Sequence, residues 1–172
     1  MSKIYSTPIP VDNLAEVQSS ILRYIPKTMW NRSLLFPIDQ KELVQRTLVG
    51  EILKKYNWVD SIEGISVVVV PGRKELQIHH DWGTLTHSFN IPILNCANTW
   101  TVWYDTDQEP RVITQENYTY CDYDASKCTE VERLELVTPH LLDVRKPHGV
   151  LNPTVGTRLV LAFRLTPDFQ RP

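Results

Sequence analysis

Residues 77–81 (Gln-Ile-His-His-Asp) contain two side chains that could act together on a metal ion. This segment is expected to be a strand, in which side chains two residues apart share a face, so His79 and Asp81 lie together and His80 lies opposite. An imidazole beside a carboxylate provides two adjacent ligands for a divalent metal. His148, on a later strand, could supply the third. Two histidines and one carboxylate leave coordination positions open, as a non-haem Fe(II) site requires.

A His-x-Asp sequence by itself is common and usually does not bind metal. The position of an arginine makes a metal site a stronger prediction in this chain. Arg158 follows His148 by ten residues, at the start of the last expected strand. A guanidinium can hold a carboxylate through two parallel hydrogen bonds, which a lysine does less specifically. The sequence therefore predicts a metal site with an anion-binding arginine nearby.

The last expected strand, residues 157–165, has two different faces. One face is wholly apolar and should pack in a core: Leu159, Leu161, Phe163 and Leu165. The other carries small residues between two arginines and suits the lining of a cavity: Arg158, Val160, Ala162 and Arg164. At about 3.3 Å per residue, Arg164 stands ~20 Å along the strand from Arg158. We expect it to form a salt bridge at the far end and not to bind the same ligand.

The order His-x-Asp, distal histidine and arginine ten residues later resembles the Fe(II)/2-oxoglutarate-dependent oxygenases. The resemblance covers residues 64–165. Within the family, the chain is most similar to the small prolyl hydroxylase-like and aspartyl/asparaginyl β-hydroxylase-like members, many of them bacterial or phage-encoded. The similarity lies in a pair of expected strands, residues 88–96 and 99–104, and in the segment around the distal histidine, residues 147–152.

This resemblance implies a mainly β fold, a double-stranded β-helix (a cupin-like jelly roll) with the N-terminal helices packed outside the barrel. It implies that His79, Asp81 and His148 hold Fe(II), that Arg158 holds the distal carboxylate of the cosubstrate 2-oxoglutarate, and that Asn90 contacts the cosubstrate. The implied enzyme is a dioxygenase. It would use O₂ to hydroxylate an unactivated C–H of an amino-acid, peptide or small-molecule substrate, releasing succinate and CO₂.

The sequence departs from the family at two points. Many relatives have Ser or Thr two residues after the cosubstrate arginine, where this chain has Val160. A second hydrogen bond to the distal carboxylate must then come from elsewhere, such as a Tyr or Ser on a facing strand. The aspartyl β-hydroxylases lack the carboxylate ligand, so Asp81 places this chain nearer the prolyl hydroxylase-like members.

The elements that must position these residues follow from hydrophobic periodicity. Helices are expected at residues 12–24, with Asp12 as N-cap, and at residues 40–56, where Asp39 and Glu42 resemble a capping box. From Gly64 onward the pattern changes to short strands, expected at 65–70, 76–81, 86–94, 99–104, 133–137, 141–145 and 157–165. Such spacing favours an antiparallel sandwich or barrel. The polar, poorly periodic residues 105–130 are expected to include a substrate lid.

Composition limits the class of protein. The chain has 172 residues, which predicts one domain over 1–172, with a helical part at about 12–56 and a β core at about 64–165. With 18 Lys and Arg against 20 Asp and Glu, the net charge of −2 argues against generic nucleic-acid binding.

No apolar run approaches the ~20 residues that span a bilayer, and the N-terminus lacks a signal-peptide core. We expect a cytoplasmic protein, and no pattern indicates its oligomeric state.

The three cysteines form no C-x-x-C pair, which argues against a disulfide framework or a zinc knuckle. Cys96 is expected to be buried, and Cys121 and Cys128 to be surface thiols. Of the remaining histidines, His140 is expected to be structural, and His87 to line the pocket mouth or to be solvated.

Two other interpretations fit parts of the pattern. One is a cupin-like metalloprotein that works without 2-oxoglutarate, against which Arg158 argues. The other is a non-catalytic barrel that serves as a binding module, against which the complete set of three ligands argues.

Overall fold

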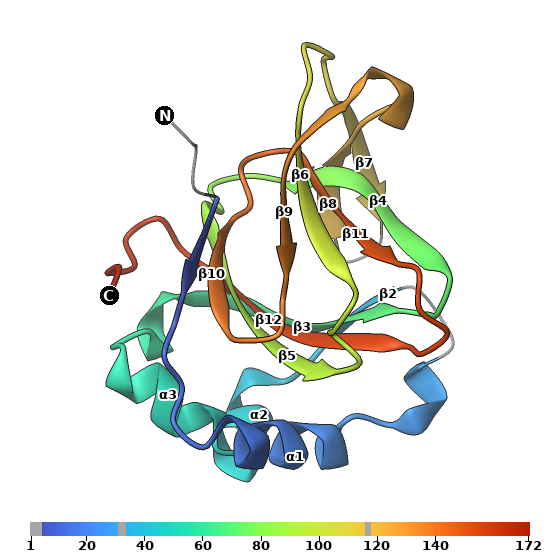
Figure 1. Ribbon diagram of the computed structural model, residues 1–172. Helices are drawn as coiled ribbons and strands as arrows, with labels where there is room; N and C mark the ends of the chain where they lie inside the picture. Colours follow the sequence, from blue (N-terminus) through green and yellow to red (C-terminus); the bar gives the residue numbers. More distant parts are fainter. Residues whose placement is uncertain (1–4, 31–33, 116–117) are drawn as a thin grey trace.

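The computed structural model describes residues 5–30, 34–115 and 118–172. Within these ranges two six-stranded antiparallel sheets lie beside three helices (Figure 1). The helices are α1 (Leu14–Tyr24), α2 (Gln40–Arg46) and α3 (Val49–Lys55). None of them is long and apolar enough to cross a membrane.

The first sheet, sheet I, has the strand order β1-β10-β5-β12-β3-β2, and sheet II has the order β7-β8-β4-β11-β6-β9. The strands of sheet I are β1 (Ser6–Pro8), β2 (Leu34–Pro37), β3 (Ile62–Val70), β5 (His87–Leu94), β10 (His140–Asp143) and β12 (Arg158–Leu165). Those of sheet II are β4 (Lys74–Asp81), β6 (Trp100–Asp105), β7 (Arg111–Gln115), β8 (Tyr118–Asp122), β9 (Thr129–Glu135) and β11 (His148–Asn152). The expected mainly β, antiparallel architecture is confirmed.

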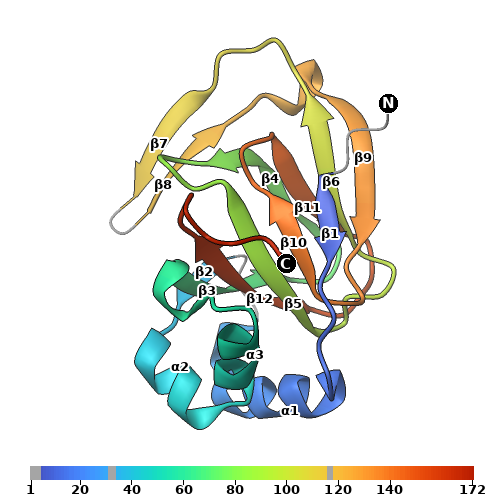
Figure 2. The same ribbon diagram turned by 90° about the vertical axis from the view of Figure 1, so that its left-hand side faces the viewer.

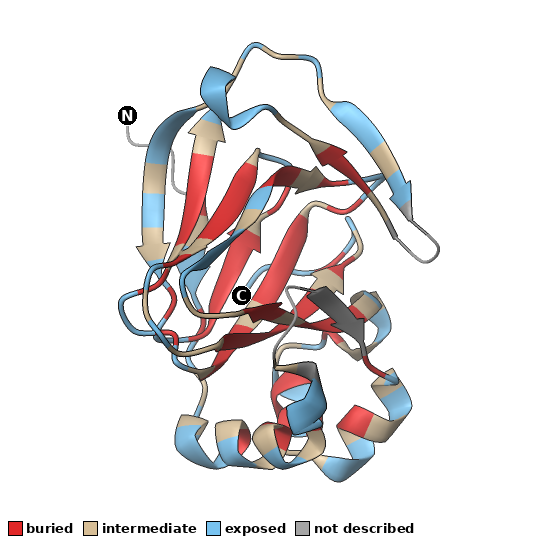
Figure 3. Cartoon of the chain, turned by 90° about the vertical axis from the view of Figure 1, so that its right-hand side faces the viewer, coloured by how far each residue is buried: buried red, intermediate tan, exposed pale blue. Residues whose placement is uncertain are grey.

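The three helices cover one face of sheet I, and sheet II lies on the opposite side of that sheet (Figure 2). Strand β12 sits at the centre of sheet I, between β5 and β3. Its face of Leu159, Leu161, Phe163 and Leu165 is buried among helix residues such as Ile21 and Leu53, so the sequence-based assignment of this face to the core is correct. Figure 3 shows the same division, with buried strands inside and exposed outer helix surfaces.

The other face of β12 points toward sheet II. Arg158, Ala162 and Arg164 line a pocket between the sheets, and Val160 packs with Cys96 and Leu136 beside it. The expectation that this face lines a cavity is therefore confirmed.

The helical expectations needed two corrections. Helix α1 begins after Asn13, whose left-handed φ of 53° ends the preceding turn, so Asp12 is not the N-cap. Asp12 instead forms a 2.8 Å ion pair with Lys55. The single helix expected at residues 40–56 is broken at Thr47, which is extended and separates α2 from α3. The cap at its start is confirmed, because the Asp39 side chain accepts the Glu42 amide at 2.7 Å.

Residues 105–130, which are polar and poorly periodic and are expected to include a substrate lid, contain regular strands. This part of the chain contains β7, β8 and the start of β9, and β8 pairs directly with β4, placing Asp122 opposite His79. Strand β8 lies between β7 and β4, and its neighbouring residues Tyr120 and Cys121 are both buried. Cys121 is only 1% exposed and is not the surface thiol expected, whereas Cys96 is buried as expected.

The connection between β11 and β12 joins the two sheets. Asn152, 2% exposed, donates to the carbonyl oxygens of Val70 at 2.9 Å, Pro71 at 3.2 Å and Gly156 at 2.8 Å. Its own carbonyl accepts the hydroxyl of Thr154 at 2.7 Å. The side-chain amide of Asn152 thus holds the turn that follows β11 against the end of β3.

Replacing Asn152 by Ala should lower the free energy of unfolding by about 2–4 kcal/mol, because the carbonyls that it satisfies are buried. Asn152→Asp keeps the side-chain size but loses the NH₂ donors, so it should destabilise as well. Urea unfolding of both variants against wild type measures the effect. If Asn152→Asp has the same free energy of unfolding as wild type, the NH₂ donors of Asn152 contribute nothing to stability.

Candidate metal and anion site

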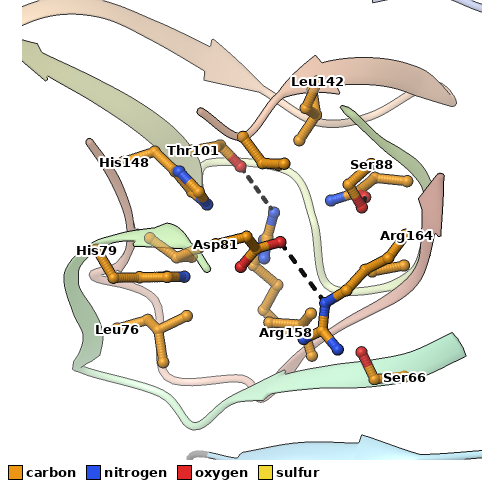
Figure 4. Close-up of a pocket in the computed structure, with 15 residues that line it drawn as sticks. Ser66, Leu76, His79, Asp81, Ser88, Thr101, Leu142, His148, Arg158 and Arg164 are labelled. Carbon is orange, nitrogen blue, oxygen red and sulfur yellow. Dashed lines mark hydrogen bonds and ion pairs between the residues drawn. The ribbon is translucent and has the colours of Figure 1, made fainter. Parts of the chain in front are cut away.

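The pocket between the sheets brings two of the expected metal ligands side by side. In the antiparallel pairing of β4 with β11, His148 stands directly opposite His79. Their ring centroids are 4.5 Å apart, and both side chains are buried (Figure 4). The register of this pair shifts just after His148, at Gly149, where a Cβ would come within 3.0 Å of the Leu76 carbonyl oxygen.

Both histidines are held in one tautomer by their own strands. His79 Nδ1 lies 2.8 Å from the carbonyl oxygen of Gln77, and His148 Nδ1 lies 2.9 Å from that of Lys146. Since a carbonyl only accepts, each Nδ1 carries the hydrogen and each Nε2 keeps a lone pair. A metal-binding histidine is oriented in this way, with its other nitrogen donating to a fixed acceptor.

The charge state of His148 agrees with this tautomer. Burial, reinforced by the neighbouring His79, lowers the pKa of His148 from 6.5 to about 4. The ring is therefore neutral near pH 7, the form that can donate a lone pair.

Asp81 lies in the same pocket, but its carboxylate has another partner. Its Oδ2 is 3.5 Å from Arg164 Nε, and Figure 4 shows Asp81 between the two histidine rings and that arginine. Across the described residues, no three His, Cys, Asp or Glu side chains form a group that could hold a metal ion. The structure thus brings the three expected ligands to one pocket without gathering them into a closed site.

Arg158 is a buried cation at the inner end of this pocket. It is 1% exposed; its Nη2 donates to the Thr101 hydroxyl at 3.3 Å, and its Nε has no hydrogen-bond partner among the described residues. Burial lowers the pKa of Arg158, opposed by the nearby Cys96 thiol. A buried guanidinium with an unsatisfied donor is costly, so an anion bound at this end of the pocket would stabilise it.

Arg164 forms a salt bridge, as expected, and its partner is the proposed ligand Asp81. It lines the same pocket as Arg158, because a long side chain at each end of β12 can reach toward the middle of the pocket. That Arg164 does not bind the same ligand as Arg158 stays a prediction.

Asn90 lines the pocket, as the expected contact with a cosubstrate requires, and its carbonyl oxygen accepts the Ser88 hydroxyl at 2.5 Å. Sequence reasoning missed three further polar residues of the lining: Ser66, Ser88 and Thr101. The alternation along β3 could have indicated Ser66, which stands between the apolar core residues Ile65 and Val67, whereas Ser88 stands between His87 and Phe89 and gave no such signal.

The remaining histidines lie outside the pocket lining. His80 contacts the Tyr123 hydroxyl at 2.7 Å, and His140 donates to the Thr138 carbonyl at 2.8 Å, the structural role expected for it. His87 is neither solvated nor at the pocket mouth. It is buried, and its Nε2 lies 2.6 Å from Arg171 near the C-terminus.

Comparison with known proteins finds similarity in fold only. No protein family and no curated protein matches the sequence. Among solved structures, AviO1 from Streptomyces viridochromogenes Tue57 superposes with a TM-score of 0.58 and 11% identity, over 96% of this chain and 89% of its own. The non-heme monooxygenase ThoJ superposes with a TM-score of 0.52 in its apo form and 0.51 in its Ni complex, both at 14% identity. These matches cover 95% of this chain and 75% and 74% of ThoJ.

If the two facing histidines hold a metal, His79→Ala and His148→Ala should each weaken metal binding by more than the ~10–100-fold typical of a supporting residue. His140→Ala is the matched control, since His140 is also buried and bonded through Nδ1 but lies outside the pocket lining. Titration with Fe(II) under anaerobic conditions, or with Co(II), measures the affinity. An equal loss in all three variants would rule out the assignment.

Acid should destabilise the protein partly through His87. Burial and the neighbouring Arg171 lower the pKa of His87 from 6.5 to about 4. The unfolded chain therefore binds this proton first, and the free energy of unfolding should fall as the pH drops from 6.5 toward 4. His87→Gln should make that decline shallower, as urea unfolding across this pH range would show. Identical pH profiles would mean that His87 is protonated in the folded protein.

Proposed function

We propose that this protein is an Fe(II)- and 2-oxoglutarate-dependent dioxygenase built on a double-stranded β-helix. The observation that carries the proposal is the combination in one pocket of two facing imidazoles, a carboxylate and a buried arginine with an unsatisfied donor. A metal site alone would not require that arginine.

The donor set fits iron in its chemistry. Two imidazole nitrogens and one carboxylate oxygen are the ligands of the non-haem Fe(II) facial triad, and no thiol lines the pocket within the described residues. His79 and His148 already present Nε2, and Asp81 would complete the set by turning toward them. Arg164 would then share its carboxylate partner with the metal.

The bound iron and cosubstrate would supply the oxidising power, in the balance R–H + O₂ + 2-oxoglutarate → R–OH + succinate + CO₂. The protein supplies binding and orientation. Arg158 would hold the distal carboxylate, and Thr101 on the facing strand β6 accepts from Arg158 and keeps its own hydroxyl hydrogen for that carboxylate. Thr101 would therefore replace the family's missing Ser or Thr at Val160. Asn90 would contact the cosubstrate from β5.

The comparisons support an oxygenase-like function. AviO1 and ThoJ have similar folds, and ThoJ is described as a non-heme monooxygenase and also as a Ni complex. We further propose that residues 1–172 act as one domain in the cytoplasm, on a small-molecule or peptide substrate and without nucleic acid or membrane.

Anaerobic addition of Fe(II) and 2-oxoglutarate tests the proposal directly. We expect a visible metal-to-ligand charge-transfer band from the chelated cosubstrate. Metal binding without the band would favour the cupin-like metalloprotein that does not use 2-oxoglutarate. Binding of neither would favour the non-catalytic barrel.

Arg158→Ala should leave metal affinity intact and weaken 2-oxoglutarate binding by about 30- to 1000-fold, the equivalent of roughly 2–4 kcal/mol for a charge-assisted bidentate pair. Arg158→Lys should recover part of the loss, because an ammonium cannot form the fork. Arg145→Ala is the control, since Arg145 pairs with Asp143 outside the pocket lining. Titration of 2-oxoglutarate into the iron-loaded variants, with succinate release as a second readout, measures the effect. Unchanged affinity in Arg158→Ala would remove the main support for the proposed function.

A further inference from the structure

Three residues form a row across the sheet I side of the pocket. Ala162 on β12 stands opposite Ser66 on β3 and opposite Asn90 on β5, and all three line the pocket. Since neighbouring strands lie about 4.8 Å apart, the Cα atoms of Ser66 and Asn90 are ~10 Å apart. The small methyl group of Ala162 therefore leaves a hollow between two polar side chains.

Ser66 carries a hydroxyl that the protein itself does not use. The residue is 3% exposed, and its hydroxyl has no hydrogen-bond partner among the described residues. Figure 4 shows the hydroxyl oxygen turned toward the inside of the pocket. A buried hydroxyl without a partner lowers stability, and a ligand that bonds to it would compensate that loss.

The side-chain amide of Asn90 has a defined orientation. Its carbonyl oxygen accepts the Ser88 hydroxyl at 2.5 Å, which leaves the NH₂ end of the amide for a ligand. An NH₂ group has two hydrogens to donate. Asn90 can therefore give one hydrogen to the cosubstrate and the other to a second ligand.

The two side chains beside the hollow are uncharged, and the charges near it are already engaged. Arg164 stands one row along the same face and pairs with Asp81, and each of these two residues has a further interaction as well. Arg158, at the other end of β12, is assigned to the cosubstrate. A carboxylate or phosphate over Ala162 would bring a charge without a counter-charge of its own, which is costly in a closed pocket. The ligand group that suits the hollow is uncharged.

We propose that Ser66 and Asn90 bind an amide group of the primary substrate, which lies over Ala162. The inference deepens the proposed function and rests on it for the identity of the metal and the cosubstrate. A trans amide is planar, with its C=O and its N–H pointing in opposite directions. Its oxygen can accept from the Asn90 NH₂ group while its N–H donates to the Ser66 hydroxyl, so one amide bridges the two strands. A lone hydroxyl offers a single oxygen for both contacts and spans less of the gap.

The position of the amide also limits where the substrate would be oxidised. Arg164, one row from Ala162, lies 3.5 Å from the carboxylate of Asp81, a proposed metal ligand. A substrate bound through its amide over Ala162 would present the carbons nearest that amide to the metal. We expect hydroxylation within a few bonds of the amide.

The test compares two small probes of nearly equal size, propionamide and butanone. Both have a carbonyl oxygen, and only propionamide has N–H donors. They are titrated, by ligand-observed NMR, into wild type loaded with redox-inert Zn(II) and saturated with 2-oxoglutarate. We expect propionamide to bind about 3- to 10-fold more tightly than butanone, which corresponds to one neutral hydrogen bond.

Two variants locate the binding. Ser66→Ala should abolish the preference for propionamide, because it removes the acceptor of the amide N–H, and should leave the affinity for butanone unchanged. Asn90→Leu should weaken the binding of both probes by about 3- to 10-fold, because both use its NH₂ donor. Without ligand, Ser66→Ala should not lower the Tm, since the hydroxyl that it removes has no protein partner among the described residues.

Thr99→Val is the matched control. Thr99 is buried, donates its hydroxyl to the Cys96 carbonyl oxygen at 2.7 Å and lies outside the pocket lining. This variant should lower the Tm and keep the preference for propionamide. A loss of the preference in Thr99→Val equal to that in Ser66→Ala would overturn the inference, because a general loss of packing would then explain both.

Two further results would contradict the inference. One is a wild type without preference for propionamide, or a preference that survives in Ser66→Ala. The other is a preference that exists without 2-oxoglutarate and disappears when 2-oxoglutarate is saturating, since the row would then belong to the cosubstrate. If Asn90→Leu does not fold in thermal unfolding, the Ser66→Ala comparison decides alone.

N-methylpropionamide distinguishes two sources of the amide, and both agree with the inference. Binding as tight as that of propionamide would identify a peptide bond as the group recognised. Binding of propionamide alone would identify the terminal carboxamide of a side chain or small molecule.

Failure of the proposed function gives a different pattern. In that case 2-oxoglutarate does not bind wild type at all, and the probes are titrated into the metal-free protein. A preference for propionamide that depends on Ser66 would still support the amide subsite. Its absence there would overturn it.

Discussion

The alternation of side chains along β12 is the constraint on which both the core and the pocket depend. This strand lies in the middle of sheet I, with the helices on one side and sheet II on the other. Its odd-numbered residues, from Leu159 to Leu165, are large and apolar, and its even-numbered residues include both pocket arginines. A shift of one residue in its pairing would place two guanidinium groups in the apolar core, at a cost comparable with the whole stability of a typical domain. The register of β12, which places its apolar residues in the core, therefore also determines that Arg158 and Arg164 face the pocket.

The parts of the site that could be predicted are those that depend on local periodicity. His79 and Asp81 share a pocket, and His80 lies outside it, because a strand has a period of two. The faces of β12 follow from the same rule. That His148 would lie next to His79 could be expected only from the resemblance to a known family. Local periodicity does not predict it, because the pairing between β11 and β4 is set by contacts between residues distant in the sequence.

The errors share a physical cause, which is that tertiary contacts overrode local signals. The salt bridge expected for Arg164 exists, but its partner, Asp81, could not be predicted, because strand length was considered without the reach of two long side chains. Residues 105–130 are polar because they include β7 and the start of β9, the two edge strands of sheet II, where exposed strands can carry polar residues. The helix at residues 40–56 has a continuous apolar pattern, yet it breaks at Thr47, whose hydroxyl bonds the Leu43 carbonyl at 2.8 Å and accepts the Val49 amide at 3.3 Å. No rule based on periodicity alone anticipates such a break.

The turn held by Asn152 has a consequence for how this protein could change during evolution. It joins the strand that begins with His148 to the strand that begins with Arg158, so a proposed metal ligand and the proposed cosubstrate anchor belong to one short, tightly bonded unit. Ser66 and Asn90 stand on two other strands, β3 and β5, outside that unit. Substitutions at those two positions could alter which molecule is accepted while the spacing of the reactive groups stays the same. Selectivity and chemistry would then be free to diverge at different rates within a single pocket.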